Sequence, residues 1–454
     1  MFASSLYRRS PIWAQEALIS LRAWSRARLR EGRTFDRMRA EVEASQWYGP
    51  EAMAHYRMAM LSRILQHAYA HCAFYRERFR EAGLEPDDIT SESDLAQLPL
   101  LDKSQVRAAG RGVLSAAARR PIFEGATSGT TGSPLRVFQD LQAINRENAF
   151  IQRQLTWAGL APKGRRAWLR GDMVAPVAQA EPPYWRLSRA ENMLMLSSYH
   201  LSQRSALAYL EALSRFDPLV IQTYPSSIAF LANWLETAGR SYEGASLRGI
   251  VSSSESLSDA QRAVIERRFG CRVFDWYGQF ERVAAIGTCE HGSYHIMSDY
   301  SLHEFLPAGD GTHEIVGTGF NNLAMPLIRY RTGDFVELAE PGASCRCGRS
   351  FPLVRAIHGR ADDVVKLPDG RHIGRLDHIF KGVNGVIEAQ IRQEALDRID
   401  ILVVPGAGYG PAVEGMLLDN ARERIGSSVA IAVRPVGNIP RTGNGKFRGV
   451  VCEL

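Results

Sequence analysis

The chain has 454 residues, of which 45% are hydrophobic and 23% are charged, and it contains six cysteines. This length predicts two or three domains, and the ordinary apolar fraction excludes a disordered or fibrous chain. No uninterrupted apolar run reaches the about 18 residues of a membrane-spanning helix, and the N-terminus lacks the pattern of a secretory signal. Six cysteines are too few for a disulfide scaffold. We therefore expect a cytoplasmic protein whose cysteines are free thiols or metal ligands.

The formal net charge of +6 is concentrated at one end of the chain. Residues 1–40 contain nine arginines and three acidic residues, so the remaining residues are neutral as a group. A neutral body does not favour a nucleic-acid-binding face. The basic segment has three interpretations: packing on the protein's own body, which we favour, docking on a second subunit of a homodimer, or peripheral contact with an anionic membrane.

The N-terminal third is predicted to be helical. Residues 11–45 form one or two helices with a broad apolar side, and residues 51–83 form a further helix that ends at Gly83. A short helix starts near Asp87. Arginines fill much of the polar side of the first segment.

From about residue 140 to 270, short apolar strands alternate with helices. The pattern predicts three strands and two helices, in the order 219–223, 226–238, 249–252, 258–269 and 272–274. Such alternation is typical of a parallel sheet and of the α/β class. Short strands and turns follow from 283 to 357, and a compact tail contains strands at 364–367 and 399–404 and a helix at 411–424.

A loop of glycines and hydroxyl residues precedes the alternating region, at residues 127–134. It contains Ser128, Gly129, Thr130, Thr131 and Gly132. Glycine lets backbone amides approach an anion and hydroxyls add donors, so this loop can wrap a polyphosphate. It is not a Walker loop, because the lysine and the spacing of that motif are absent. A polar surface turn is the alternative interpretation.

Further segments follow the loop in a fixed order. They are Ser253-Ser254-Glu255-Ser256, Tyr277-Gly278-Gln279-Phe280-Glu281, Tyr330-Arg331-Thr332-Gly333-Asp334, Gly359-Arg360-Ala361-Asp362-Asp363 and Pro440-Arg441-Thr442-Gly443-Asn444-Gly445-Lys446. Together with the loop they resemble the adenylate-forming superfamily from about residue 50 to 450. Cys289-Glu290-His291-Gly292 and Cys345-Arg346-Cys347-Gly348-Arg349 narrow the resemblance to phenylacetate-CoA ligases and to the ligase-like proteins associated with capsular polysaccharide synthesis.

The resemblance implies a fold with three parts. We expect a basic helical arm at 1–45, a large α/β adenylation domain at 46–359, and a small mobile α+β lid domain at 360–454. It also implies an enzyme that joins a carboxylic acid to ATP, forming acyl-adenylate and pyrophosphate, and then transfers the acyl group. Coenzyme A is the expected acceptor, and an amine or hydroxyl of a sugar or another molecule is the alternative.

Residue roles follow from the same resemblance. Lys446, Glu281 and Thr130 are the expected catalytic residues, and Glu281 also places Mg²⁺. Asp362 is the expected hinge. ATP would contact the loop residues 128–132 and the following side chains and backbone: Ser253, Ser254, Glu255, Trp276, Tyr277, Gly278, Asp334, Arg360 and Lys446. The acid would contact Tyr224, Pro225, Trp276, Gly278 and Phe280.

One residue departs from the family pattern. Phe280 stands where the family has Ser or Thr beside the glutamate, a hydroxyl that helps to hold phosphate or metal. The phenyl ring could instead form a wall of the acid pocket. Phe280 is also the best support for another interpretation, in which the chain is a degenerate relative that binds nucleotide without turnover.

Four soft ligands predict a metal site. Cys289, His295, Cys345 and Cys347 would close a tetrahedral Cys₃His zinc site, with His291 as the competing histidine. Four protein ligands leave no open position, so the zinc would be structural. Buried free cysteines are the alternative.

Overall fold

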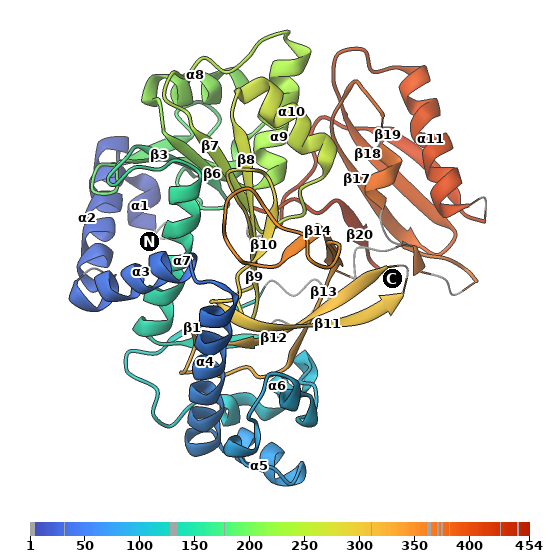
Figure 1. Cartoon of the computed structure of the whole chain (residues 1–454). Coiled ribbons are helices and arrows are strands. Elements are labelled where there is room, and N and C mark those ends of the chain that lie inside the picture. Colours follow the sequence, from blue (N-terminus) through green and yellow to red (C-terminus); the bar gives the residue numbers. More distant parts are fainter. Residues whose placement is uncertain are drawn as a thin grey trace. The chain divides into compact units, whose positions relative to one another are not determined.

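The computed structural model in Figure 1 describes most of the chain. The described residues are 5–30, 32–127, 135–176, 178–309, 311–360, 365–369, 372–373, 376–380, 382–426, 428–442 and 445–454. The chain forms two compact units. The first unit comprises Met1–Ser25, Ala158–Asp275 and Gly359–Leu454, and the second comprises Arg26–Trp157 and Trp276–His358. The predicted domain limits at residues 45 and 359 stay a prediction.

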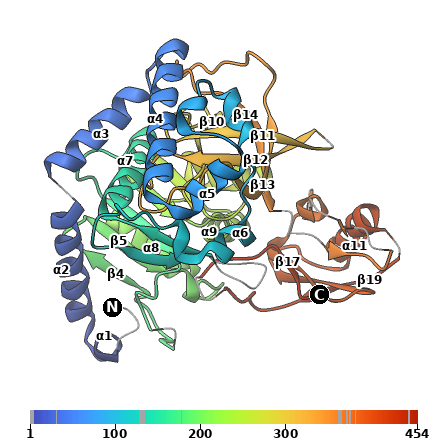
Figure 2. The ribbon, with the colours of Figure 1, turned by 90° about the horizontal axis from the view of Figure 1, so that it is seen from below.

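Two consecutive helices begin the first unit (Figure 2). They are α1 (Ser5–Arg9) and α2 (Ile12–Arg30), the latter as far as Ser25. One side of each is fixed to the unit: Tyr7 and Ile19 are buried in an apolar cluster, and the Tyr7 hydroxyl donates to the Val174 carbonyl oxygen at 2.8 Å. Gln15 accepts a 2.6 Å hydrogen bond from buried Arg186.

A mainly parallel sheet forms the centre of the first unit. Its strands neighbour one another in the order β7, β6, β3, β5, β4, and only β4 runs antiparallel to its neighbour. Apolar side chains of the sheet and of helices α8, α9 and α10 share one core. The bounds are β3 Arg166–Arg170, β4 Trp185–Ser188, β5 Met193–Ser197, η4 Ser198–His200, α8 Ala206–Phe216, β6 Val220–Thr223, α9 Pro225–Thr237, β7 Gly249–Ser253 and α10 Asp259–Phe269.

Local sequence signals explain the ends of α10. The Ser258 hydroxyl accepts from the Gln261 amide at 3.2 Å, and the Gln261 side chain accepts from the Ser258 amide at 3.1 Å, which is a capping box. Gly270 ends the helix in the left-handed conformation, with φ at 67°. The predicted strand–helix alternation from 219 to 274 and the α/β class are confirmed.

The C-terminal segment, Gly359–Leu454, adds a smaller sheet to the first unit. Strands β19, β18, β17 and β20 lie in that order, with β17 and β18 antiparallel and both outer pairs parallel. Ile387 and Val404 of this segment join the apolar core that contains α9. The bounds are β14 Leu353–Arg360, which begins in the second unit, β15 Val365–Lys366, β16 His372–Ile373, η5 Leu376–Phe380, β17 Val386–Ala395, β18 Arg398–Pro405, α11 Pro411–Ile425, β19 Ala430–Pro435 and β20 Val450–Cys452.

The second unit combines helices with antiparallel strands. Strands β1 and β2 form a hairpin-like pair, and β11, β12, β13, β14, β10 and β9 lie in that order, with the end of β8 paired to β9. Two apolar clusters form its core. The bounds are α3 Arg33–Ser45, α4 Pro50–His71, α5 Ala73–Glu81, η1 Pro86–Asp88, η2 Ser93–Gln97, α6 Lys103–Ala109, η3 Gly110–Val113, β1 Phe123–Ala126, β2 Arg136–Gln139, α7 Leu141–Trp157, β8 Arg272–Gly278, β9 Ala285–Thr288, β10 Tyr294–Ile296, β11 Ser301–Gly309, β12 Thr312–Gly319 and β13 Tyr330–Leu338.

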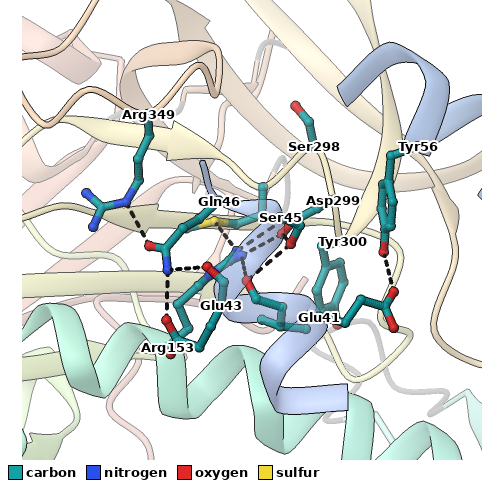
Figure 3. A network of polar contacts seen from close by, with 12 residues as sticks. Glu41, Glu43, Ser45, Gln46, Tyr56, Arg153, Ser298, Asp299, Tyr300 and Arg349 are labelled. Atoms are coloured by element: carbon teal, nitrogen blue, oxygen red, sulfur yellow. Dashed lines mark hydrogen bonds and ion pairs between the residues drawn. The ribbon is translucent and has the colours of Figure 1, made fainter. Parts of the chain in front are cut away.

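A buried ion pair fastens α3 to α7 in the second unit (Figure 3). Arg153 of α7 donates to both carboxylate oxygens of Asp299, at 2.5 and 3.1 Å, and the two side chains are 1% and 0% exposed. Arg153 also donates to the Val42 carbonyl oxygen at 2.9 Å, and the Ser45 hydroxyl donates to Asp299. Because Val42 and Ser45 belong to α3, the ion pair is shared by both helices.

The predicted helix at 51–83 is wrong in one respect. The structure has two helices, because the buried Cys72 adopts an extended conformation between α4 and α5. Tertiary contacts hold the second helix: the Tyr75 hydroxyl donates to the Pro326 carbonyl oxygen and accepts from the Ile328 amide. Gly83 does follow the second helix with a φ of 68°, as predicted.

Candidate active site and metal centre

The end of β8 and the middle of β13 bring two predicted nucleotide-binding residues together in the second unit. The Tyr277 hydroxyl donates to Asp334 at 2.8 Å, and the Gln279 side chain donates to the same carboxylate oxygen at 3.3 Å. Burial raises the pKa of Tyr277 well above its usual value, and the Asp334 carboxylate raises it further. Tyr277 is therefore a permanent donor that fixes the orientation of Asp334. Its predicted contact with ATP stays a prediction.

Glu281 follows β8 and is buried in the second unit. Its carboxylate accepts from the Tyr330 hydroxyl at 3.4 Å. The next residue, Arg282, lies in the left-handed region with φ at 58° and donates to the Ala143 carbonyl oxygen at 2.5 Å. Burial beside a tyrosine hydroxyl suits a carboxylate whose charge is to be balanced by a cation, because a buried charge needs partners.

Phe280, unlike the buried Glu281, is 42% exposed. Its ring lies on the backbone of Gly125 in β1, where a Cβ atom would come within 2.4 Å of the ring. Phe280 lines a cavity of about 290 Å³ together with six further side chains and Gly125. Those lining residues are Phe123, Glu124, Gly125, Gln139, Ile144, Asn148 and Arg282. The predicted pocket wall at Phe280 therefore has a cavity beside it.

The phosphate loop is described only at its ends. Ser128, Gly129, Thr130, Thr131 and Gly132 lie outside the described residues. Thr127 and Leu135 close the two ends, because the Thr127 amide donates to the Leu135 carbonyl oxygen and the Leu135 amide donates to the Thr127 hydroxyl, both at 3.0 Å. The loop is therefore anchored directly after β1.

In the first unit, Ser254 and Tyr224 meet at an arginine. Arg170, at the end of β3, donates to the Ser254 hydroxyl at 2.5 Å, and its guanidinium lies 4.7 Å from the centre of the Tyr224 ring. Pro225 opens α9 next to Tyr224, and Ser253 ends β7. Sequence reasoning missed Arg170, because no motif or spacing distinguishes it from the other arginines.

Glu255 contacts the backbone of the segment that carries Lys446. Its carboxylate accepts from the Phe447 amide at 2.6 Å and from the Ser226 amide at 3.1 Å. Burial raises the pKa of Glu255 above its ordinary value. Glu255, which the sequence predicts to contact ATP, thus holds the backbone directly after Lys446.

A buried ion pair supports the same segment. Arg441 donates to Glu388 of β17 at 2.5 Å, and each side chain is 9% exposed. Burial raises the pKa of Glu388 to about 7, although the Arg441 charge acts in the opposite direction. Gly445 has a φ of 70° and lies so close to Gly171 that a Cβ atom would come within 2.5 Å of its Cα. Both the conformation and the close approach require glycine.

The two expected hinge-region residues are described only in part. Arg360 is the last residue of β14, and nothing is described of its side chain. Asp362 lies outside the described residues. Their predicted roles therefore stay predictions.

The four predicted metal ligands meet in the second unit. The ligand atoms of Cys289, His295, Cys345 and Cys347 all lie within 4.8 Å of one another. The sulfurs of Cys289 and Cys345 are 3.6 Å apart, and Cys347 Sγ lies 3.4 Å from His295 Nε2. Tetrahedral zinc, with bonds of about 2.0–2.3 Å, separates its ligand atoms by about 3.5–3.8 Å. Sulfur and imidazole donors at this spacing fit zinc.

The histidine of this site is oriented by a carbonyl group. His295 Nδ1 lies 3.4 Å from the Phe351 carbonyl oxygen, which leaves Nε2 facing Cys347. Burial lowers the pKa of His295 to about 4, so the imidazole is neutral and able to bind metal. His291 contributes only its backbone amide, which donates to Cys289 Sγ at 3.3 Å. His295 is thus the histidine of this group among the described residues.

Comparisons with known proteins agree with this fold. 2-Hydroxyisobutyryl-CoA ligase in its postadenylation state, bound to an acyl-AMP, superposes with a TM-score of 0.67 at 20% identity, covering 89% of each chain. A second structure of that ligase, in the thioesterification state, gives 0.57 at 21% identity, covering 90% of this chain and 91% of the other. The fold is that of the adenylate-forming ligases, as the sequence predicts.

Sequence relatives narrow this class. Residues 367–453 match the CapK C-terminal domain. Protein CapK of Staphylococcus aureus is 25% identical, covering 84% of this chain and 85% of CapK, and the phenylacetate-coenzyme A ligase of Pseudomonas putida is 27% identical, covering 80% and 79%. The chain is a homologue of CapK and of the phenylacetate-CoA ligases over most of its length, which confirms the predicted resemblance. These relatives also support the predicted enzyme class, an AMP-forming acid ligase.

Proposed function

We propose that this chain joins a carboxylic acid to ATP to form an acyl-adenylate and pyrophosphate, and then transfers the acyl group to coenzyme A. One observation carries the proposal: the chain is 27% identical to a phenylacetate-coenzyme A ligase over 80% of its length. Its own motifs supply Glu281, Asp334, Lys446 and the hydroxyl loop, which the predicted resemblance assigns to this chemistry. In the reaction the carboxylate attacks the α-phosphorus of ATP, and the bond to the bridging oxygen of pyrophosphate breaks.

The residues of the second unit suit the nucleotide. Asp334, held by the Tyr277 hydroxyl, retains oxygen lone pairs that can accept from both ribose hydroxyls. Glu281 would hold Mg²⁺, which neutralises charge on the phosphates when bound. The loop that starts at Thr127 would donate amides and hydroxyls to the departing phosphates. Thr130 and the other loop residues keep their predicted roles as part of this proposal.

The residues of the first unit suit the reacting centre. Lys446 would place its ammonium beside the oxygens that gain charge as the carboxylate attacks. Glu255 holds the adjoining backbone amide of Phe447 at 2.6 Å, so it is a positioning residue for Lys446. The proposed hinge at Asp362 would then withdraw Lys446 for the second half-reaction.

The cavity beside Phe280 is the proposed site of the acid. Its volume of about 290 Å³ and its two phenylalanines suit a flat or medium-sized apolar acid, and Asn148, Gln139 and Arg282 supply polar groups. Tyr224, Pro225, Trp276 and Gly278 are not among the residues that line this cavity, so their predicted contact with the acid stays a separate prediction. Phe280 stands where the family has Ser or Thr, and in this proposal its ring forms a wall of the acid-binding cavity.

A second acceptor is favoured by one observation. The match to the CapK C-terminal domain covers 367–453, the part that would face the acceptor after the proposed rotation. The predicted resemblance to ligase-like proteins associated with capsular polysaccharide synthesis makes an amine or hydroxyl of a sugar or another small molecule the second candidate acceptor.

An exchange assay tests the proposal. Purified protein is incubated with ATP, Mg²⁺, labelled pyrophosphate and a panel of aryl, fatty and amino acids. Acid-dependent label in ATP is the expected result, and coenzyme A or amine acceptors added afterwards distinguish the two transfer reactions by their products. If no acid supports exchange while ATP still binds, the chain is the degenerate relative instead.

The cysteine and histidine group is proposed to hold a structural zinc ion. The four ligands occupy a full tetrahedron, so no position remains for a substrate. Zinc would join the turn after β9 to the segment before β14.

A further inference from the structure

The outer side of α1 and α2 carries large apolar side chains that remain exposed. Leu6, Trp13, Leu21 and Trp24 are 74, 73, 60 and 47% exposed. Single exposed apolar residues are normal on any protein surface. Four within nineteen positions, two of them tryptophan, form a patch of the kind that marks an interaction site.

The helical geometry places three of these residues on one face of α2. Residues 13, 17, 21 and 24 are spaced four, four and three apart, which keeps them on one side of an α-helix. Gln15, Ile19 and Ala23 lie on the opposite side and are buried. The helix is therefore fixed to the first unit by one face and presents a second, apolar face outward.

The charge on this outward surface has one sign. Arg8, Arg9 and Arg22 are exposed on α1 and α2. Within the described residues 5–30, Glu16 is the one acidic residue, and its carboxylate accepts from the Leu187 amide at 3.0 Å, so it faces the unit. The outward surface therefore combines arginine with tryptophan and leucine and carries no carboxylate among the described residues.

We propose that α1 and α2 form a membrane-docking surface that lies flat on an anionic lipid bilayer. Tryptophan prefers the boundary between headgroups and acyl chains, because its ring is apolar and its N–H needs a polar partner. Arginine pairs with phosphate through two parallel hydrogen bonds. No helix within the described part of the chain is long and apolar enough to cross a bilayer, so α2 lies in the interface.

This occupant is favoured by charge complementarity. A second copy of the chain would bring the same arginines to the same face, where they repel. An anionic bilayer instead attracts each arginine on the outward surface of α1 and α2. The proposal is independent of the acid ligase activity and places that activity, whatever its acceptor, at a lipid surface.

Vesicle sedimentation with the full chain tests the proposal. The vesicles contain phosphatidylcholine alone or phosphatidylcholine mixed with phosphatidylglycerol. We expect binding to the mixed vesicles at least about tenfold tighter than to the neutral ones, weakening as salt is added. Trp13→Ser, Leu21→Ser and Trp24→Ser combined should reduce it about tenfold or more, as should Arg8→Gln, Arg9→Gln and Arg22→Gln combined.

Matched controls use exposed residues elsewhere in the first unit. Leu396→Ser with Met416→Ser, at positions 48 and 45% exposed, and Arg204→Gln with Arg215→Gln should leave vesicle binding unchanged. Circular dichroism and the melting temperature verify that each variant is folded. Pyrophosphate exchange without lipid should be the same for all of them, which separates this proposal from the proposed function.

Three outcomes would overturn the proposal. The first is wild-type protein that does not sediment with anionic vesicles. The second is equal binding by the wild type and the Trp13, Leu21 and Trp24 variant. The third is a sedimentation velocity measurement in which the wild type is an oligomer and that variant is a monomer, since a second copy would then cover the face.

Discussion

At the residue scale, Glu255 links two motifs that lie far apart in the chain. It accepts from the Phe447 amide, 192 positions away, and from the Ser226 amide. Glu255→Gln keeps one acceptor oxygen and sets an NH₂ group against the other amide, so Lys446 loses its fixed position. We expect the rate of pyrophosphate exchange to fall roughly tenfold to a hundredfold, with the KM for ATP unchanged.

A control separates positioning from nucleotide binding. Glu211→Gln, at an exposed position of α8, should leave exchange at the wild-type rate. An increase in the KM for ATP in Glu255→Gln, with kcat intact, would instead support the sequence-based prediction that Glu255 contacts ATP.

The raised pKa of Glu388 predicts that the stability of the fold depends on pH. Burial raises its pKa to about 7 from the ordinary 4.5. Between these values the unfolded chain loses a proton that the folded chain keeps, so this group makes the free energy of unfolding decrease as the pH rises from 4.5 to about 7. Glu388→Gln removes that term. The variant should have the same melting temperature as the wild type near pH 4.5 and a higher melting temperature than the wild type near pH 8.

Calorimetry across this pH range measures the difference. Glu394→Gln, exposed on the same strand, is the control and should follow the wild type throughout. A Glu388→Gln variant that melts below the wild type at neutral pH would show instead that the ionised pair with Arg441 stabilises the fold.

The motifs pointed to candidate side chains, but not to the partners of those side chains. The sequence pointed to Asp334, Glu255 and Lys446 singly. The hydrogen bond from Tyr277 to Asp334 and that from Phe447 to Glu255 depend on strand ends that meet only in the folded chain. Arg170 carries no local signal, because an arginine at the end of a strand is ordinary until its neighbours are known.

At the element scale, the ion pair that joins α3 to α7 predicts a large stability effect. Arg153→Met leaves the Asp299 carboxylate buried and without its charge partner, so we expect the free energy of unfolding to fall by about 3–5 kcal/mol. Arg153→Met with Asp299→Asn should recover part of the loss. Arg136→Met, which breaks an exposed pair with Glu124, should change the stability little.

Denaturant unfolding of the four proteins gives these values. A single Arg153→Met variant as stable as the wild type would mean that water reaches Asp299 and that the two helices are held by apolar contacts alone.

The metal ligands predict a coupling between zinc and α3. Arg349, two residues after Cys347, donates to Gln46 at 3.0 Å and stacks 4.0 Å over the Trp157 ring. Gln46 directly follows α3, so loss of zinc should loosen this helix end as well as the metal site. We expect Cys345→Ser to lose one equivalent of zinc and to melt at a lower temperature.

Elemental analysis and hydrogen exchange check this coupling. Exchange in residues 41–47 should rise after chelation, while Cys452→Ser should retain both zinc and protection. Purified protein without zinc, combined with an unchanged melting temperature for Cys345→Ser, would favour buried free cysteines.

Elements with strong local signals were predictable, and those fixed by tertiary contacts were not. The ends of α10 have local sequence signals, because Ser258 and Gln261 form a capping box at its start and Gly270 follows its last residue. The break at Cys72 has no proline, glycine or capping residue to announce it, since it depends on Tyr75 bonding to the Pro326 carbonyl. The four metal ligands were predictable because thiols and imidazole are rare enough in this chain for their spacing to be informative.

At the scale of the whole molecule, the excess positive charge and the proposed phosphate chemistry belong to different parts of the sequence. The proposed phosphate chemistry uses Lys446, a metal ion and backbone donors in a body whose charges balance. The excess of +6 belongs to residues 1–40. The alternation of strands and helices and the order of the motifs were enough to predict the fold class, because these properties do not depend on side-chain packing.

The two half-reactions provide the test at this scale. If Lys446 serves adenylation and is withdrawn for acyl transfer, Lys446→Ala should reduce acid-dependent pyrophosphate exchange by about two to three orders of magnitude. Acyl transfer from preformed acyl-adenylate should stay near the wild-type rate, because that step would proceed with Lys446 outside the site. Arg448→Ala, two residues further along the same segment, is the control. Equal losses in both half-reactions would mean that one arrangement of the chain serves both steps.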